Sequence, residues 1–378
     1  MSGSYNAHSD LSASGAHRWM ACPPSAMLEK QFENVTSVFA EEGTAAHDLA
    51  EHKLKRALKM RTKKPNSQYQ NDEMDDMTDL YVEYCLNVIK KMRESCPDLQ
   101  ILIEQRLDFS DYVPGGFGTG DLVVVGNKTL HVIDLKYGKG IEVSAYQNPQ
   151  MMLYALGALS LFDMLYDIEQ VVMTIVQPRV DNFSTYELTV TELLDWAEKE
   201  LKPKALLASK GDGEYEAGEH CRFCRAKNVC RARSMKNLEL LKYEFSNPDL
   251  LSDDEISEII GLSSELSKWA DDVFTYAQAR AIEEGKDWTG FKLVEGRSRR
   301  RYTNEERVAV AAKEAGYLDI YKKSLISITE MEKLMGKKMF KDIIGTYVEK
   351  PKGKLTLVPE SDKRKAVNPI ESEFQIED

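Results

Sequence analysis

The chain has 378 residues, of which 42% are hydrophobic and 30% are charged, a composition typical of a soluble globular protein. Its length exceeds that of one average domain, so we expect two structural units. No apolar run approaches the roughly 18 residues that a membrane span needs, and the N-terminal segment lacks a signal-peptide core. The net charge of −12 excludes a protein that coats nucleic acid through bulk positive charge, but it suits an enzyme whose carboxylates attract divalent cations.

The first part of the chain is expected to be helical. A cap signal at Ser12 and Ser14 precedes a short helix that must stop or restart at Cys22-Pro23-Pro24. Strong helix formers follow over residues 41–59, with leucines at helical spacing. After a polar loop, helical periodicity returns over residues 79–94.

From residue 101 the apolar period changes to that of strands. Three runs, ILIEQRLDF, FGTGDLVVVG and KTLHVIDLKYG, predict three antiparallel strands, with Gly126-Asn127 as the turn between the last two. The following pattern predicts a helix over 146–161, strands over 169–177 and 185–188, and a helix over 191–207. We therefore expect an α/β core.

Two aspartates and a lysine occupy related positions on the second and third of these strands. If Gly126-Asn127 closes a two-residue hairpin, Asp121 lies one step diagonal to Asp134, whereas a four-residue loop places them directly opposite. In both registers Asp121, Asp134 and Lys136 share one face, because side chains alternate along a strand.

Carboxylates on one face are costly to bury unless a cation joins them, and a hard divalent ion such as Mg²⁺ or Mn²⁺ satisfies them. We expect Asp121 and Asp134 to hold this ion, with the carbonyl of Leu135 completing its ligands. Lys136 would then stabilise a phosphate or orient the attacking water. The alternative is an ordinary solvated strand face.

Three further residues lie where such a site would use them. Gln150 and Tyr154 are four residues apart, so they share one face of the predicted helix, although Tyr154 would equally serve as a core aromatic. His47, on an earlier helix, would ligate metal through its imidazole or contact DNA.

Together these residues resemble the RecB-like branch of the PD-(D/E)XK nucleases. That family orders a helix histidine, G-x-x-D, (D/E)-x-K and Q-x3-Y, as found here in His47, Gly118 to Asp121, Asp134 to Lys136, and Gln150 to Tyr154. The resemblance covers roughly residues 10–233. It implies a restriction-endonuclease-like core, a central mixed sheet flanked by helices, followed by a mostly helical extension over residues 234–378.

Four cysteines form a second pattern. Cys221, Cys224 and Cys230 read C-x2-C-x5-C, and thiolates at this spacing bind a metal centre that needs one more ligand. The resemblance implies that Cys22 supplies it and that the four thiolates hold a 4Fe-4S cluster, since relatives of the AddB and CRISPR-associated exonuclease type place one cysteine before the nuclease motifs and three after. Zinc is the alternative, because four thiolates also suit a tetrahedral structural site and His220 offers an alternative ligand. Clustered thiols also favour the reducing cytoplasm.

The last third of the chain lies outside the resemblance. Long helical periodicity covers residues 252–284, and further helical stretches cover residues 304–315 and 328–344. A basic run would grip a DNA backbone, or would be a solvated surface; it comprises Arg297, Arg299, Arg300 and Arg301. We expect this region to guide DNA or to build an oligomer, whose state the sequence leaves open.

The leading prediction is a Mg²⁺- or Mn²⁺-dependent deoxyribonuclease, an exonuclease in recombination or repair, with DNA as its substrate. The resemblance further implies a phage or prophage setting and a recombinase or single-strand annealing protein as partner. The alternatives are a catalytically inactive DNA-binding or scaffolding module of the same fold, and a zinc-stabilised adaptor.

Overall fold

A computed structural model describes residues 9–34, 37–126, 128–162, 165–239, 252–291, 310, 328–343 and 347–348. The chain forms two compact units, Met1–Arg280 and Ala281–Asp378. The sequence placed the boundary at residue 233, whereas by its contacts most of the long helix that follows belongs to the first unit. No helix among the described residues is long and apolar enough to cross a membrane.

The first unit is built on a five-stranded mixed sheet in the order β1-β2-β3-β4-β5. Neighbouring strands are antiparallel except for β3 and β4, which are parallel. A parallel pair needs a crossover, and the helix α5 (Pro149–Phe162) provides it. The strands are β1 (Gln100–Asp108), β2 (Phe117–Gly126), β3 (Thr129–Leu135), β4 (Gln170–Gln177) and β5 (Asn182–Thr189).

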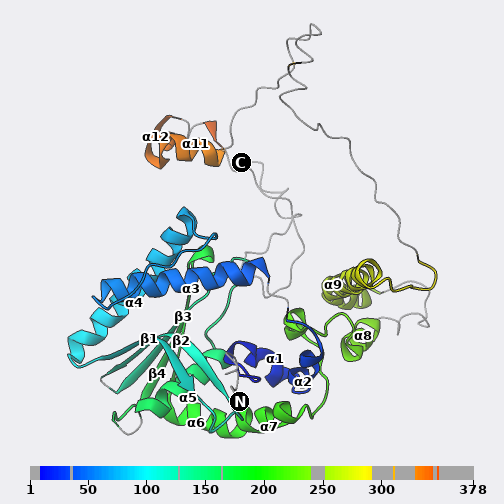
Figure 1. The fold of residues 1–378 in the computed structure, drawn as a ribbon, viewed down its shortest axis with the longest axis horizontal. Coiled ribbons are helices and arrows are strands. Elements are labelled where there is room, and N and C mark those ends of the chain that lie inside the picture. The colour runs from blue at the N-terminus through cyan, green and yellow to red at the C-terminus, as the bar shows by residue number, and fades with distance from the viewer. Residues whose placement is uncertain are drawn as a thin grey trace, which may run out of the picture. The chain divides into compact units, whose positions relative to one another are not determined.

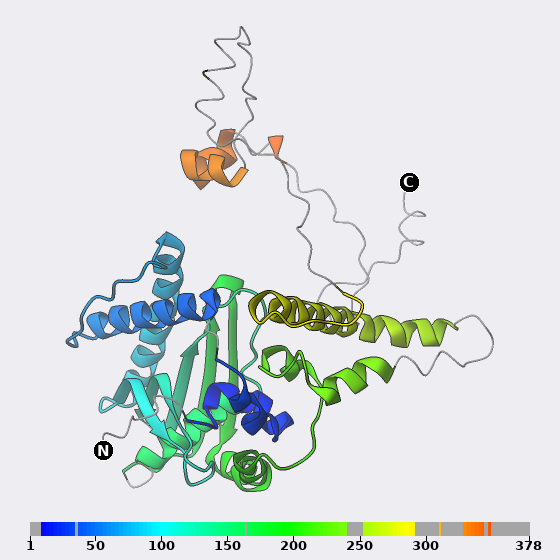
Figure 2. The same cartoon turned by 45° about the vertical axis from the view of Figure 1, so that its right-hand side comes forward.

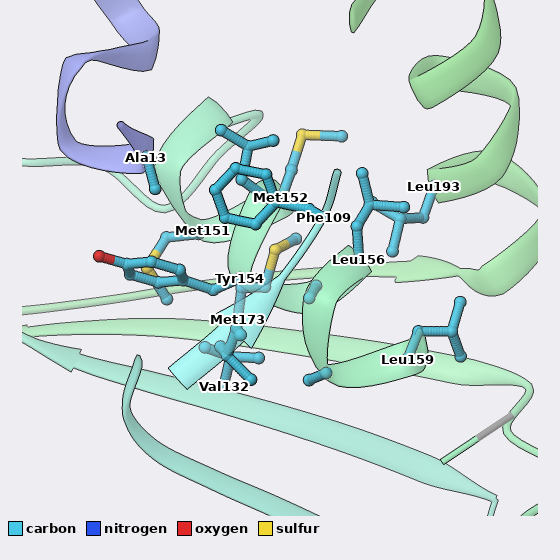
Figure 3. Close-up of a cluster of buried hydrophobic side chains, with 14 of the residues drawn as sticks. Ala13, Phe109, Val132, Met151, Met152, Tyr154, Leu156, Leu159, Met173 and Leu193 are labelled. Carbon is cyan, nitrogen blue, oxygen red and sulfur yellow. The ribbon is translucent and has the colours of Figure 1, made fainter. Parts of the chain in front are cut away.

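Helix α5 covers one face of the sheet. It is apolar all round, as expected of a helix buried between a sheet and further helices. Figure 3 shows its side chain Tyr154 near Met173 of β4 and Val132 of β3, and its side chain Leu156 near Leu193, all within one buried cluster. Close approach to β1 depends on Gly157, where a Cβ atom would lie 2.8 Å from the Cβ of Leu107.

Helices α3 (Val38–Ala57) and α4 (Asp72–Ser95) cover the opposite face, as Figures 1 and 2 show. Each begins at a residue whose side chain accepts a hydrogen bond from the first turn, Ser37 for α3 and Asn71 for α4. Both bury an apolar stripe against the side chains of Leu122 and Ile133. This two-sided cover confirms the α/β prediction at the level of a mixed sheet flanked by helices.

The remaining helices lie around this core and in the second unit. The short segments before α3 contact α7, and α8 follows the cysteine segment. The remaining helices are η1 (Ala13–Gly15), α1 (Ala16–Ala21), α2 (Ser25–Leu28), η2 (Glu29–Gln31), η3 (Pro178–Val180), α6 (Val190–Trp196), the π-helical turn η4 (Ala197–Leu201), α7 (Lys202–Lys210), η5 (Glu219–Phe223), α8 (Arg231–Leu238), α9 (Asp253–Glu283), α11 (Ile328–Met335) and α12 (Lys337–Ile343).

Candidate functional site

The hairpin of β2 and β3 brings Asp121 and Asp134 together. Gly126 pairs with Thr129 and Leu122 pairs with Ile133, so the next pair toward the open end is Asp121 with Asp134. The turn therefore lies one residue later than predicted. Of the two predicted registers, the one that places Asp121 directly opposite Asp134 is found. The backbone amide of Leu135 donates a hydrogen bond of 2.7 Å to Oδ2 of Asp121. The sequence predicted that the carbonyl of Leu135 would take part in the site. In the structure, the contact described for Leu135 is made by its backbone amide.

Four of the predicted residues form one continuous row of polar contacts. Nζ of Lys136 lies 2.8 Å from Oδ2 of Asp134 and donates a hydrogen bond of 3.0 Å to Oε1 of Gln150. The amide of Gln150 in turn donates to the hydroxyl of Tyr154 at 3.0 Å. The ring of Tyr154 is buried in the core beneath, while its hydroxyl accepts the hydrogen bond from Gln150.

Glycine makes room for this row. A Cβ atom at Gly118 would lie 2.8 Å from Cε1 of Tyr154, and one at Gly120 would lie 2.8 Å from Cδ1 of Leu107. The Gly118-Thr119-Gly120 segment therefore lets side chains of the core approach β2 closely.

His47 reaches the same site from α3. Its Nδ1 lies 3.2 Å from Oδ1 of Asp121. Burial lowers the pKa of His47, but the charge of Asp121 and the hydrogen bond to it prevail and raise that pKa to about 9. The protonated imidazole thus acts as the positive partner of Asp121. Divalent cations that bind Asp121 would compete with this proton.

The two aspartates differ in their electrostatics. Burial raises the pKa of Asp121, but His47 and the Leu135 amide outweigh burial and hold that pKa below its usual value. Burial raises the pKa of Asp134, and the Lys136 ammonium only partly opposes this. Oδ2 of Asp134 is fully buried and, among the described residues, has no hydrogen bond of good geometry despite its ion pair. A carboxylate oxygen in this state fits a site for a cation.

Glu104 on β1 is a site residue that the sequence reasoning missed. Ligand atoms of His47, Glu104 and Asp121 all lie within 4.8 Å of one another. Burial, followed by the charge of Asp121, raises the pKa of Glu104 to about 8. A signal was present, since Glu104 is the one acidic residue inside the run ILIEQRL of the first strand.

The cysteines come from two segments that the fold brings into contact. Cys22 directly follows α1, while Cys221 lies in η5 and Cys224 directly follows η5. All three are buried, and Cys230 is partly exposed. Burial raises the pKa of Cys224 to about 11, so this thiol needs a cation nearby to ionise at neutral pH.

Glu29 joins the two cysteine-bearing segments, and no pattern in the sequence indicated this. Its carboxylate accepts hydrogen bonds from Nε of Arg18 at 2.8 Å and from the backbone amide of Arg225 at 2.7 Å. Arg18 also donates to the carbonyl of Phe223. The carboxylate of Glu29 is almost fully buried, so this junction is a specific contact between residues nearly two hundred positions apart.

His220 lies beside Cys22, and a hydrogen bond between them raises the pKa of His220. Its Nε2 lies 2.9 Å from the carbonyl oxygen of Glu216. The amide of Gly218 donates to Sγ of Cys221 at 3.4 Å. Within the described part of the chain, no three of the cysteine sulfur atoms lie within 4.8 Å of one another.

The C-terminal third is described mainly over helix α9. Arg297, Arg299, Arg300 and Arg301 lie outside the described residues. Helix α9 is fixed to the cysteine segment by Arg233, whose almost fully buried guanidinium donates to Glu265 and Asp272. Ion pairing between Lys227 and Asp272 adds to this contact.

Two comparisons place the chain among known proteins. A solved structure described as "Crystal structure of SSO0001" is 14% identical, and the match covers 56% of this chain and 95% of that chain with a TM-score of 0.20. A score this low supports no argument about the fold. A family model described as "Protein of unknown function (DUF2800)" matches residues 8–365. The chain therefore belongs to the DUF2800 family.

Proposed function

We propose that this protein is a metal-dependent DNA nuclease with a RecB-like PD-(D/E)XK core. The observation that carries the proposal is the polar row at the open end of the β2–β3 hairpin. There a buried pair of aspartates meets Lys136, which lies between Asp134 and Gln150. The resemblance to RecB-like nucleases uses the same residues in the same order.

Asp121 and Asp134 would hold a divalent cation, with the His47 imidazole and the Leu135 carbonyl as further ligands. Burial of both carboxylates supports this, because Oδ2 of Asp134 lacks a hydrogen bond of good geometry even with the Lys136 ammonium 2.8 Å away. When bound, Mg²⁺ or Mn²⁺ would polarise a phosphodiester and make an attacking water more acidic.

The remaining residues have roles that follow from their contacts. Lys136 presents its ammonium group at the aspartates, where it would donate a hydrogen bond to a phosphate oxygen or orient the water. Gln150 fixes the direction of Lys136, because its carbonyl accepts from the lysine while its amide donates to Tyr154. Tyr154 anchors that amide from the core.

We further propose that the four cysteines hold a 4Fe-4S cluster. The resemblance supports this cofactor, and so does the burial of Cys22, Cys221 and Cys224 in two segments that are in contact. Zinc is the alternative, since four thiolates also suit a tetrahedral zinc site. Its role would be structural, because Cys22 and the segment from Cys221 to Cys230 bracket the proposed catalytic residues in sequence.

Cleavage assays on the full-length protein, purified without oxygen, test the nuclease proposal. The wild type should degrade linear DNA with Mg²⁺ or Mn²⁺, and Asp134→Asn and Lys136→Met should each slow cleavage by about a thousandfold. Lys139→Met is the matched control, because Lys139 is exposed on the loop just beyond the site and should leave the rate unchanged.

The outcomes separate the alternatives. Wild-type protein that binds DNA without cutting it would be an inactive module of the same fold. Cleavage that persists in Asp134→Asn would remove the proposed mechanism. Degradation of linear but not circular DNA would support an exonuclease, as the proposed role in phage or prophage recombination with a recombinase or annealing protein requires. Iron and inorganic sulfide in equal amounts would support the cluster, whereas stoichiometric zinc would replace it.

A further inference from the structure

Positive charge is concentrated where α3 ends and in the segment that follows it. Residues 53–64 contain lysines and arginines but no acidic residue, although the chain as a whole has a net charge of −12. Helix α4 adds Lys90, Lys91 and Arg93 near its own end. A surface of one sign on a protein of the opposite net charge attracts partners that carry the complementary charge.

Most of these cations lack a partner within the protein. Lys53 pairs with Asp75 and Asp79 of α4, and Lys55 pairs with Glu51. The others are exposed and have no ion pair within the described part of the chain; they form the basic patch, which comprises Arg56, Lys59, Arg61, Lys63, Lys64, Lys90, Lys91 and Arg93. Unpaired like charges repel one another, so this arrangement is unfavourable until an anionic group binds.

The dipoles of the two helices account for only part of the basic patch. Arg56 and Arg93 lie in the last turns of α3 and α4, where a cation is favourable. This effect falls off within one turn. Lys63 and Lys64 lie beyond the end of α3, and Lys90 lies more than one turn before the end of α4, so the dipoles do not explain them.

Lys59 keeps its charge at a position that favours glycine. Its φ is 59°, in the left-handed region. The amide of Met60 donates to the carbonyl of Lys55 at 2.8 Å, which is a helix end where glycine is usual at the position of Lys59. The next residues are held beside α3, because the hydroxyl oxygen of Thr62 lies 3.3 Å from Nδ1 of His52. The cations that follow the helix are thereby kept close to it.

An apolar groove lies between α3 and α4, which pack side by side in Figures 1 and 2. The groove has a volume of about 460 Å³, and its apolar lining includes Leu58, Leu86 and Ile89. Two members of the basic patch, Lys90 and Arg93, also line it. A groove of this volume is within the range of sites that take up small molecules or side chains of a bound peptide.

We propose that the groove and the basic patch form a docking surface for an acidic segment of a partner protein, in which apolar side chains stand between Asp and Glu residues. The apolar side chains would fill the groove, and the carboxylates would pair with the basic patch around it. A nucleic-acid backbone fits less well, because it offers no apolar group to Leu86 and Ile89, and Glu94 in the lining would repel its phosphates.

This docking surface is separate from the candidate site. No residue that lines the groove also lines the cavity beside His47 and Asp121. None of them is among the residues that the sequence assigned to metal binding or catalysis. The inference therefore goes beyond the proposed function and does not depend on DNA cleavage.

Fluorescence anisotropy of labelled synthetic peptides tests the docking surface on the full-length protein. One peptide carries leucine and phenylalanine between Asp and Glu residues, and a second has serine in place of the leucine and phenylalanine. The wild type should bind the first about tenfold more tightly than the second. Lys90→Glu/Arg93→Glu should weaken binding of the first peptide about tenfold, because repulsion replaces attraction. Leu86→Ala should weaken it about fivefold by removing part of the groove wall.

Lys210→Glu/Lys268→Glu is the matched control. Both lysines are exposed, lie outside the basic patch and have no ion pair among the described residues, so this variant changes the net charge equally and should bind the first peptide like the wild type. Circular dichroism verifies folding. Lys59→Gly removes one charge of the basic patch and suits the positive φ, so it should fold at least as stably as the wild type and bind the peptide about twofold more weakly.

Three results would overturn the inference. They are the absence of saturable binding of the first peptide, equal affinity of the wild type for both peptides, and an equal loss of affinity in the matched control. Single-stranded and duplex oligonucleotides, titrated in EDTA, distinguish the other class of partner. Unchanged DNA affinity in Lys90→Glu/Arg93→Glu supports the proposal, whereas a loss as large as that for the peptide would identify a nucleic-acid surface and refute it.

Discussion

The open end of the β2–β3 hairpin and the junction at Glu29 both bury charged groups, but they satisfy them differently. At the junction, the Glu29 carboxylate has the Arg18 guanidinium and the Arg225 amide as partners. At the hairpin end, Asp134 keeps an oxygen without a hydrogen bond of good geometry, and Glu104 on the neighbouring strand β1 has a left-handed backbone. The junction is arranged for stability, whereas the hairpin end leaves polar groups incompletely paired and open to a ligand.

This difference leads to opposite expectations for mutation. Removing a charge at the hairpin end should cost activity and leave stability intact or improved, because the buried group is incompletely satisfied in the free protein. Removing the charge at the junction should cost stability, because its partners would lose their hydrogen bonds.

The largest effect is expected for Asp134→Asn. DNA cleavage should fall about a thousandfold, equivalent to about 4 kcal/mol of transition-state stabilisation. The free energy of unfolding, measured with urea in the absence of divalent cations, should be unchanged or higher, since the variant removes a buried charge. A clear loss of stability in Asp134→Asn would show that the hairpin end is a structural ion-pair site.

Glu29→Ala should have the opposite effect, because it should lower stability. We expect it to lower the free energy of unfolding by about 3 kcal/mol, because it strands the Arg18 guanidinium and the Arg225 amide. Urea denaturation measures this loss, and Glu33→Ala is the matched control on the exposed surface of the same segment. Unchanged stability in Glu29→Ala would mean that the cysteine-bearing segments are joined by other contacts.

A buried histidine on β3, His131, makes the stability of the fold depend on pH. Burial lowers the pKa of His131 to about 4, and its Nε2 lies 2.9 Å from the hydroxyl oxygen of Thr174. In the unfolded chain His131 is protonated near pH 6.5, whereas in the folded chain it is protonated only near pH 4. The stability that the neutral buried imidazole contributes is therefore lost as the pH falls from 6.5 to 4.

Between pH 7 and pH 5 the wild type should therefore lose about 2 kcal/mol that His131→Gln does not lose. Urea denaturation of both proteins at the two pH values measures the difference. Parallel losses in both proteins would show that His131 is protonated in the folded state.

The hairpin end was largely predictable because its residues lie close together in sequence. Alternating apolar residues define β2 and β3, so Asp121, Asp134 and Lys136 could be assigned to one site before the structure was known. The sequence is compatible with two registers of this hairpin, because Gly126-Asn127 does not determine the position of the turn to one residue. Helical spacing likewise indicated that Gln150 and Tyr154 act together.

What could not be predicted depends on distant contacts and on backbone conformation. Glu104 is the one acidic residue inside ILIEQRL, but an acidic residue in a strand is usually solvent-facing. The interrupted pairing with β2 and the positive φ identify it in the structure. The importance of Glu29 and Arg233 follows from partners that no local pattern reveals. Sequence periodicity identified α9, but it did not indicate that the helix belongs to the first unit.

The smallest expected effect concerns the backbone of Glu104. Glu104→Gly should raise the free energy of unfolding of the cation-free protein by about 1 kcal/mol, because glycine adopts a φ of 51° without a steric cost. Gln105→Gly is the comparison variant, because the backbone there is ordinary paired strand and glycine should destabilise it by a similar amount. Calorimetric melting of both variants measures the contrast. A loss of stability in Glu104→Gly would mean that the glutamate side chain contributes more packing than its backbone costs, and the hairpin end would then resemble the junction in being arranged for stability.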